Sequence, residues 1–158
     1  MPFTPFHLGT ALFLGEIFEK RINMAAIMLG SIIVDIRATY CFFTGCQPLH
    51  GPLHTYLGAT FLALLVVIGI YGGRHILEKI TLRLRMKQDY SLYSIIAGAL
   101  IGTWSHVLLD SFLYTDIIPL WPLELNPFYG ILSFSLVYSV CIGCFVLGSF
   151  IFFYKLYR

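Results

Sequence analysis

Four long stretches of the chain are apolar and nearly free of charge, and this pattern constrains the fold more than any other feature. They run from Ile22 to Phe43, Leu53 to Gly73, Ser91 to Tyr114 and Gly130 to Tyr154. Each is long enough to cross a bilayer, which takes about 20 residues of α-helix. A shorter apolar segment, Pro5 to about Lys20, is expected to form a short span or a re-entrant helix. The sequence therefore predicts an all-α fold: a polytopic transmembrane helix bundle, with residues 1–158 in one domain.

The composition agrees with a lipid environment. Of the 158 residues, 58% are hydrophobic and 11% are charged, whereas soluble domains have roughly 25% charged residues. The net charge of +2 is too small to indicate a nucleic-acid partner, so the expected partner is the lipid bilayer. The first residues lack the basic region and the cleavage site of a signal peptide, and none is expected.

The basic residues predict the orientation of the spans. Segment 74–90 holds five Lys or Arg and two Asp or Glu, a net charge of +3, and the positive-inside rule places such a segment in the cytoplasm. The loops 44–52 and 115–129 contain no Lys or Arg. We therefore expect a protein of the cell (inner) membrane with a cytoplasmic C-terminus. Four further basic residues then lie on the cytoplasmic side: Lys20, Arg21, Lys155 and Arg158.

Ionisable residues gather in the outer half of the predicted bundle. His106 and Asp110 are four residues apart and share one helical face. His50 and His54 have the same spacing, with His54 expected in the first turn of the third helix and His50 just outside it because of Pro52. Ligand pairs from two helices, joined by single residues from others, are how a helix bundle builds a metal site. The candidate ligands are His7, Asp35, His50, His54, His106 and Asp110.

Mixed imidazole and carboxylate donors suit Zn²⁺, with Mn²⁺ or Fe²⁺ as alternatives, better than Mg²⁺ or Ca²⁺. An ionised Asp at membrane depth costs about 2.5–3.5 kcal/mol on insertion scales, and a divalent cation offsets that cost. Two other interpretations remain open: the polar residues fasten helices together, or they form a proton or ion pathway. Asp116 and Glu124, in the outer loop, are weaker candidates for residues that contact the metal ligands without binding the metal themselves.

The four cysteines form no zinc-type pair. Cys41 and Cys46 flank a short turn and can form a disulfide. Cys141 and Cys144 lie one helical turn apart in an apolar run, so we interpret them as packing residues.

Four stretches carry a family resemblance: PFHLGTALFLG, GSIIVDI, HGPLHTYLGA and GTWSHVLLDSFLYTDIIPLWPL. In this order they resemble the membrane-bound metal-dependent hydrolase family, which includes LexA-regulated inner-membrane hydrolases. That family has an early His, an Asp-x-Asp ending a hydrophobic helix, a His-Arg-Gly-x-Thr-His-Ser block, a Ser-His-x-x-x-Asp helix and a Pro-Leu-x-Trp-Pro tail. Pro119 to Pro122 match the tail. The resemblance implies a metal-ligand role for His7, Asp35, His50, His54, His106 and Asp110.

The chain departs from the family pattern at two points. Arg37 stands where the family has the second Asp of Asp-x-Asp, which argues against a binuclear site that needs this carboxylate. The block HGPLHTY lacks the Arg and the Thr that precede the second His in the family. Two alternatives exist for Arg37: it binds a substrate phosphate, or it snorkels outward.

The leading hypothesis is a membrane metal-dependent hydrolase whose site opens to the extracytoplasmic side. His54, His106 and Asp110 are the expected core of the catalytic centre, and Asp35, His7 and His50 complete the shell or act as the base. A metal ion at this centre makes hydroxide available near neutral pH. Its depth favours a lipid or lipid-linked ester or phosphoester. The alternatives are a metal-ion or proton-coupled transporter and a non-catalytic protein with a polar helix-packing cluster.

Overall fold

The computed structural model describes residues 4–83, 86 and 88–157. These residues form helices and connecting segments, and no strand occurs among them. Four helical stretches are long and apolar enough to cross a membrane, and a shorter apolar helix precedes them, which confirms the predicted fold class. The helices are α1 (Thr4–Ile17), α2 (Met24–Ile33), α3 (Ile36–Thr44), the 3₁₀ turn η1 (Gly51–His54), α4 (Tyr56–Arg83), α5 (Leu92–Ser111) and α6 (Phe134–Tyr157).

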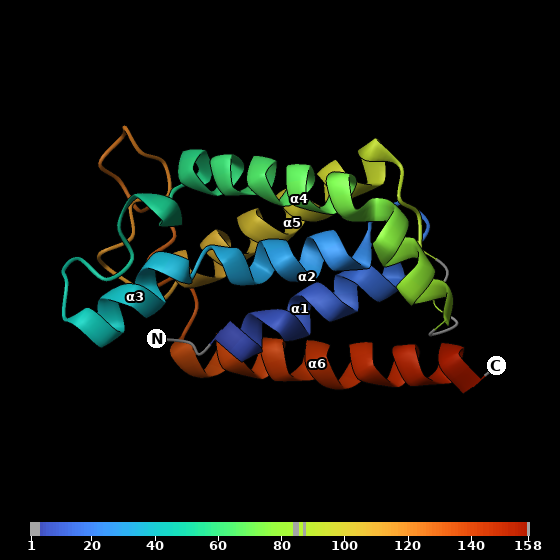
Figure 1. Cartoon of the computed structure of the whole chain (residues 1–158). Helices are drawn as coiled ribbons and strands as arrows, with labels where there is room; N and C mark the ends of the chain where they lie inside the picture. Colours follow the sequence, from blue (N-terminus) through green and yellow to red (C-terminus); the bar gives the residue numbers. More distant parts are fainter. Residues whose placement is uncertain (1–3, 84–85, 87, 158) are drawn as a thin grey trace.

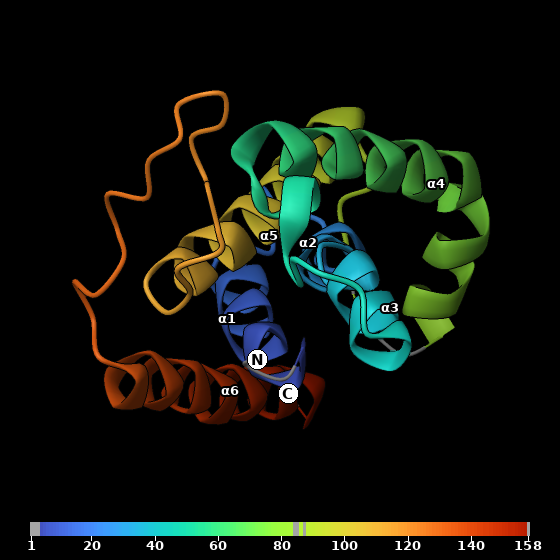
Figure 2. The same cartoon turned by 90° about the vertical axis from the view of Figure 1, so that its left-hand side faces the viewer.

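The helices run side by side, and the two termini lie at opposite ends of the bundle (Figure 1). One end, called the site end, carries α3, η1 and the segment 112–133, which extends away from the helices (Figure 2). The basic end is where α1 ends and α2 begins, and it carries Lys20, Arg21, Arg83 and Lys155.

Helices α2 and α5 form the centre of the bundle because glycines let their backbones approach closely. A Cβ on Gly98 would lie 2.7 Å from the Asn23 carbonyl oxygen, and one on Gly30 would lie 2.8 Å from that of Ala99. Small residues allow this kind of close helix contact in membranes. The close contact brings the last turn of α2 beside the last turns of α5, at the site end.

Apolar side chains from α4 complete this core. One buried cluster joins Ala26 of α2 with Val66 of α4 and Ile95 of α5. A second cluster, nearer the site end, joins Val34 with Leu62 and Val107. Helix α1 packs between α2 and α6, so that α6 lies on the outside of the bundle (Figures 1 and 2).

The second predicted helix, residues 22–43, is two helices rather than one. The chain turns at Val34 and Asp35, where the Asp35 amide donates to the Ile32 carbonyl over 3.1 Å and α3 begins at the next residue. The two helices together still form one stretch long and apolar enough to span, Met24–Thr44, which agrees with the predicted segment. Helix α3 ends at Gly45, whose positive φ of 74° suits glycine.

Helix α4 is longer than predicted and continues through the first half of the expected basic loop, to Arg83. At about 1.5 Å per residue its 28 residues reach roughly 42 Å, which exceeds the hydrocarbon thickness of about 30 Å. Its last turns bend across the basic end of the bundle (Figures 1 and 2). Segment 74–83 contains no Pro, so nothing in the sequence stops the helix at Gly73. Arg85 and Lys87 lie outside the described residues.

Candidate metal centre

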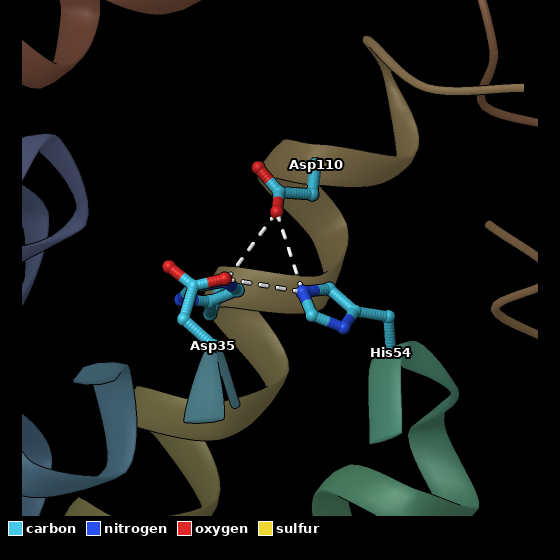
Figure 3. Close-up of side chains that lie close together, drawn as sticks. Asp35, His54 and Asp110 are labelled. Atoms are coloured by element: carbon cyan, nitrogen blue, oxygen red, sulfur yellow. Dashed lines mark ion pairs between the residues drawn. The ribbon is translucent and has the colours of Figure 1, made fainter. Parts of the chain in front are cut away.

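Four side chains meet at the site end of the bundle: Asp35, His54, His106 and Asp110. One donor atom from each lies within 4.8 Å of the donor atoms of the other three. All four residues are buried, and His54 and His106 have no exposed surface. Figure 3 shows Asp35, His54 and Asp110 pointing toward one another from three different elements.

Each element presents its residue for a local reason. Asp35 lies in the turn between α2 and α3, and its side chain makes no capping hydrogen bond to α3. His106 and Asp110 are one turn apart on α5, as the sequence predicts. His54 ends the η1 turn rather than lying in the third long helix, since α4 begins only at Tyr56. This corrects the predicted start at Leu53.

The η1 turn is set by two features of the sequence. Gly51 adopts a positive φ of 57°, a conformation that favours glycine. Thr55 is extended, and its hydroxyl accepts a hydrogen bond of 2.9 Å from the Gly58 amide, which caps the start of α4. The chain therefore reverses direction immediately after His54 and holds its imidazole toward α5.

The four donor atoms lie close enough to one another to bind a common ion. His54 Nε2 lies 3.3 Å from Asp35 Oδ1 and 3.6 Å from Asp110 Oδ2. His106 Nε2 lies 3.3 Å from Asp35 Oδ1 and 3.4 Å from Asp110 Oδ2. Ligand atoms that share one metal ion have separations of this size, since Zn–N and Zn–O bonds are about 2.0–2.2 Å long.

Direct hydrogen bonding explains these contacts less well. Charge-assisted N–H···O bonds measure about 2.7–2.9 Å, and all four separations are longer. Moreover, the Nε2 atoms of His54 and His106 are buried and make no hydrogen bond within the described part of the chain. Both nitrogens thus face a common point rather than a single acceptor.

The other ring nitrogens are held by backbone carbonyls. His106 Nδ1 donates to the Ser31 carbonyl over 2.6 Å, and His54 Nδ1 donates to the His50 carbonyl over 3.2 Å. A carbonyl oxygen only accepts, so each Nδ1 carries a proton and each Nε2 is turned toward the centre. Metal-binding histidines are oriented in this way. Ser31 is one helical turn before Asp35, but a carbonyl contact of this kind leaves no mark in the sequence.

The protonation state of His54 suits a metal ligand. Burial lowers the pKa of His54 below its ordinary value, although the neighbouring Asp35 acts in the opposite direction. The imidazole is therefore neutral at neutral pH, which is the form that binds metals.

His7 borders the four-residue group without belonging to it. Its ring stacks on that of His106, with 3.9 Å between the ring centroids. Its Nε2 lies 3.1 Å from Asp110 Oδ1. Asp110 therefore directs one oxygen to His54 and His106 and the other to His7.

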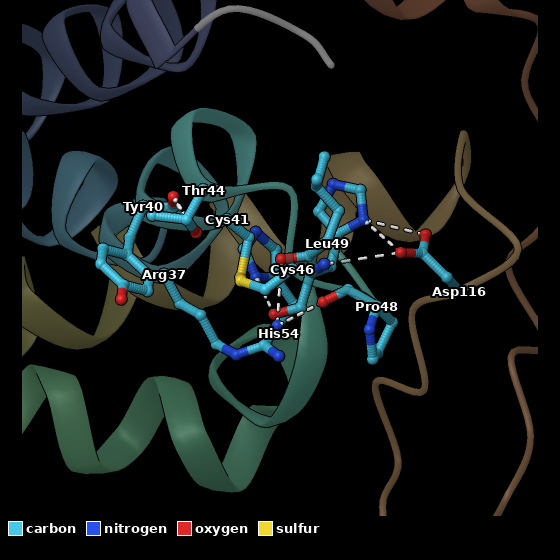
Figure 4. Close-up of a disulfide and its surroundings, with 10 residues drawn as sticks. Arg37, Tyr40, Cys41, Thr44, Cys46, Pro48, Leu49, His54 and Asp116 are labelled. Atoms are coloured by element: carbon cyan, nitrogen blue, oxygen red, sulfur yellow. Dashed lines mark hydrogen bonds and ion pairs between the residues drawn. A yellow bond between two sulfur atoms is a disulfide. The ribbon is translucent and has the colours of Figure 1, made fainter.

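His50 also lies outside the four-residue group, and it contacts His54 rather than the common centre. Its Nδ1 is 2.9 Å from both carboxylate oxygens of Asp116, and its carbonyl supports His54 as described above. The structure thus gives Asp116 a place behind the site, through His50 (Figure 4). Glu124 is exposed.

Arg37 takes a role that neither sequence alternative anticipated. Its Nη1 donates to the carbonyls of Pro48 and Leu49, over 2.6 and 3.1 Å, and so fastens the segment that leads into η1. The same segment is closed by a disulfide between Cys41 and Cys46 (Figure 4).

Searches of the curated proteins and of the solved structures gave no match. A family model described as "Domain of unknown function (DUF4184)" matches residues 1–125, a range that includes every residue of the metal-type cluster. The chain therefore belongs to the DUF4184 family.

Proposed function

We propose that the protein is an integral membrane metal-dependent hydrolase that acts on a lipid or lipid-linked ester or phosphoester. The observation that carries the proposal is the convergence of two imidazole nitrogens and two carboxylate oxygens, all from buried residues and all within 4.8 Å of one another. The sequence resemblance to membrane-bound metal-dependent hydrolases supports it independently.

The donor set favours zinc. Two imidazole nitrogens and two carboxylate oxygens suit Zn²⁺, with Mn²⁺ or Fe²⁺ as alternatives. A divalent cation held here would balance the charges of Asp35 and Asp110, which are costly at this depth. Asp35, His54, His106 and Asp110 would hold the ion.

A bound divalent cation polarises the bond under attack and makes hydroxide available near neutral pH. The chain's own residues then have distinct tasks. The carbonyls of Ser31 and His50 keep the two ligand rings in one orientation. His7, beside Asp110 Oδ1, is placed to take up or release a proton next to the centre.

We propose that the site end faces the extracytoplasmic side of the cell (inner) membrane and that the C-terminus is cytoplasmic. The distribution of Lys and Arg supports this orientation through the positive-inside rule. The Cys41–Cys46 disulfide gives separate support, because disulfides persist in oxidising compartments outside the cytoplasm. A site at this depth lies level with lipid headgroups and ester bonds.

One observation favours a second candidate function. Four protein donors can satisfy a zinc ion by themselves, and structural zinc sites are closed in this way, whereas catalytic sites keep a position open. A permanently held ion would fasten α2, η1 and α5 together without catalysis. In a hydrolase, a position beside these four residues would have to stay open for water or substrate.

A hydrolysis screen separates the two functions. Detergent-purified protein, loaded with Zn²⁺ or Mn²⁺, is assayed on phosphatidic acid, diacylglycerol and p-nitrophenyl esters in mixed micelles. Asp35→Asn and Asp110→Asn are compared with Glu124→Gln, whose side chain is exposed. The hydrolase proposal predicts turnover that both Asp variants lose and the control keeps. Metal-loaded wild type that is inactive on every substrate, and less stable after metal removal, would favour the structural role.

A further inference from the structure

Beyond the four metal-type donors, the site end holds further buried polar atoms. Asp110 Oδ1, both ring nitrogens of His7 and the Tyr114 hydroxyl are buried and make no hydrogen bond among the residues that the structure describes. His7 Nε2 and Asp110 Oδ1 have each other as near neighbours, at 3.1 Å. The Tyr114 hydroxyl has no such neighbour among the ion pairs and hydrogen bonds of the structure.

Tyr114 is held firmly in place. Its amide donates to the Asp110 carbonyl over 3.1 Å. Asn126, from the outer segment, donates to the Tyr114 carbonyl over 3.2 Å and to that of Ser111 over 3.0 Å. The Tyr114 ring packs against His50, with 4.5 Å between the centroids. The position of the hydroxyl is thus fixed by backbone contacts of its own turn and by ring packing.

The hydroxyl is a donor without an acceptor. Burial raises the pKa of Tyr114, and the Asp110 carboxylate raises it further, so the proton stays on the oxygen at neutral pH. Buried hydroxyl groups in proteins normally find a partner. A neutral donor within the electrostatic reach of Asp110 and Asp35 suits one kind of partner, an oxygen atom that carries partial or full negative charge.

We infer that Tyr114 is a substrate-binding residue whose hydroxyl donates a hydrogen bond to an oxygen of an oxyanion-bearing ligand held at the metal centre. This inference rests on the proposed function. It narrows the substrate to groups that present an oxygen acceptor beside the scissile bond, for which a phosphoester is the simplest case. The role inferred for Tyr114 is in binding alone, and no covalent bond changes.

The test uses inorganic phosphate as the probe and Tyr114→Phe as the variant, because this change removes the hydroxyl and keeps the ring against His50. Tyr129→Phe, in an exposed part of the same outer segment, is the matched control. Each protein is loaded with Co²⁺ in detergent. Metal content, the thermal midpoint and the phosphate dissociation constant, from the Co²⁺ absorption spectrum, are then measured.

The inference predicts that Tyr114→Phe binds as much Co²⁺ as wild type, keeps or raises its thermal midpoint, and binds phosphate about tenfold more weakly. Tyr129→Phe should match wild type in all three. Equal phosphate affinity in Tyr114→Phe and wild type, or a metal-loaded wild type that binds no phosphate, would refute the inference and leave the metal centre standing. A lower thermal midpoint with unchanged phosphate affinity would assign the hydroxyl a structural role. Wild type that takes up no Co²⁺ would refute the proposed function, and the inference with it.

Discussion

Replacing Gly102 by Ala should damage the metal centre from a position that contributes no ligand. Gly102 lies on α5, one turn before His106, and packs against α2. A Cβ at this position would lie 3.0 Å from the Ser31 amide and would approach the Ile27 carbonyl oxygen more closely than real Cβ atoms do. Both neighbours are backbone atoms of α2, so they cannot move without displacing the helix itself. The two helices must separate by roughly 0.5–1 Å to restore van der Waals contact.

The size of this separation decides the outcome. A shift of about 0.8 Å would lengthen the contact between His106 Nδ1 and the Ser31 carbonyl from 2.6 Å to roughly 3.4 Å, beyond the usual hydrogen-bond range. It would also widen the gap between Asp35 and His106, which are carried by the two separated helices. Overpacking itself costs about 1–3 kcal/mol. We therefore expect a lower thermal midpoint and at least a tenfold loss in zinc affinity, the range seen when ligand-orienting contacts are removed.

Gly143→Ala is the matched control, because no atom lies within 4 Å of a Cβ at Gly143, which is also in a helix. That variant should bind zinc like wild type and be equally or slightly more stable, since Ala is the better helix former. Zinc affinity is measured by competition with a chromophoric chelator, and stability by thermal unfolding in detergent. If Gly102→Ala bound zinc as tightly as Gly143→Ala, the close contact of α2 with α5 would not position the donors, and the reasoning would fail.

Three further predictions follow from other parts of the molecule. Burial lowers the pKa of His54 in the folded protein, so the unfolded state binds protons more readily. Metal content and stability should therefore be retained at pH 7.5 and fall as the pH drops below about 6.5. Metal analysis after dialysis at each pH measures this. Ser91→Ala removes the side chain that caps α5 through the Ser94 amide; it should cost about 1 kcal/mol in the free energy of unfolding and leave metal content unchanged. In intact cells, a membrane-impermeant maleimide should label Cys46 only after reduction of the disulfide, and labelling that requires permeabilised cells would contradict the proposed orientation.

The fold class was predictable because long apolar segments are strong signals. The details that failed share a cause. The turn at Asp35 has no Pro or Gly to mark it, and α4 continues to Arg83 past a pair of glycines, Gly72 and Gly73. Hydropathy reports where lipid surrounds the chain, and tertiary contacts decide where a helix bends or ends.

The candidate site was predictable where helical spacing determines it and less so elsewhere. His106 and Asp110 share a face of α5, as their spacing requires. His50 has the same spacing from His54, but η1 is a 3₁₀ turn, and the ring of His50 turns to Asp116 instead. The metal-ligand roles predicted for His7 and His50 stay predictions.

The contacts that orient the centre have no sequence signal. The carbonyl of Ser31 reaches His106 only because glycines bring α2 close to α5. The Asn126 side chain donates a hydrogen bond to the Tyr114 carbonyl, 12 residues earlier in the chain, and so fixes that turn. Both contacts depend on how separate elements pack, which the order of residues does not disclose.

Metal content of the detergent-purified protein, determined by mass spectrometry without chelators, tests the central claim most directly. His106→Ala removes one donor, and His75→Ala, an exposed histidine far from the centre, is its matched control. A metal centre formed by the four donors predicts about one zinc, manganese or iron ion per chain in wild type and in His75→Ala, and its loss in His106→Ala. A folded wild type without metal, or a His106→Ala variant that keeps the full metal content, would contradict it.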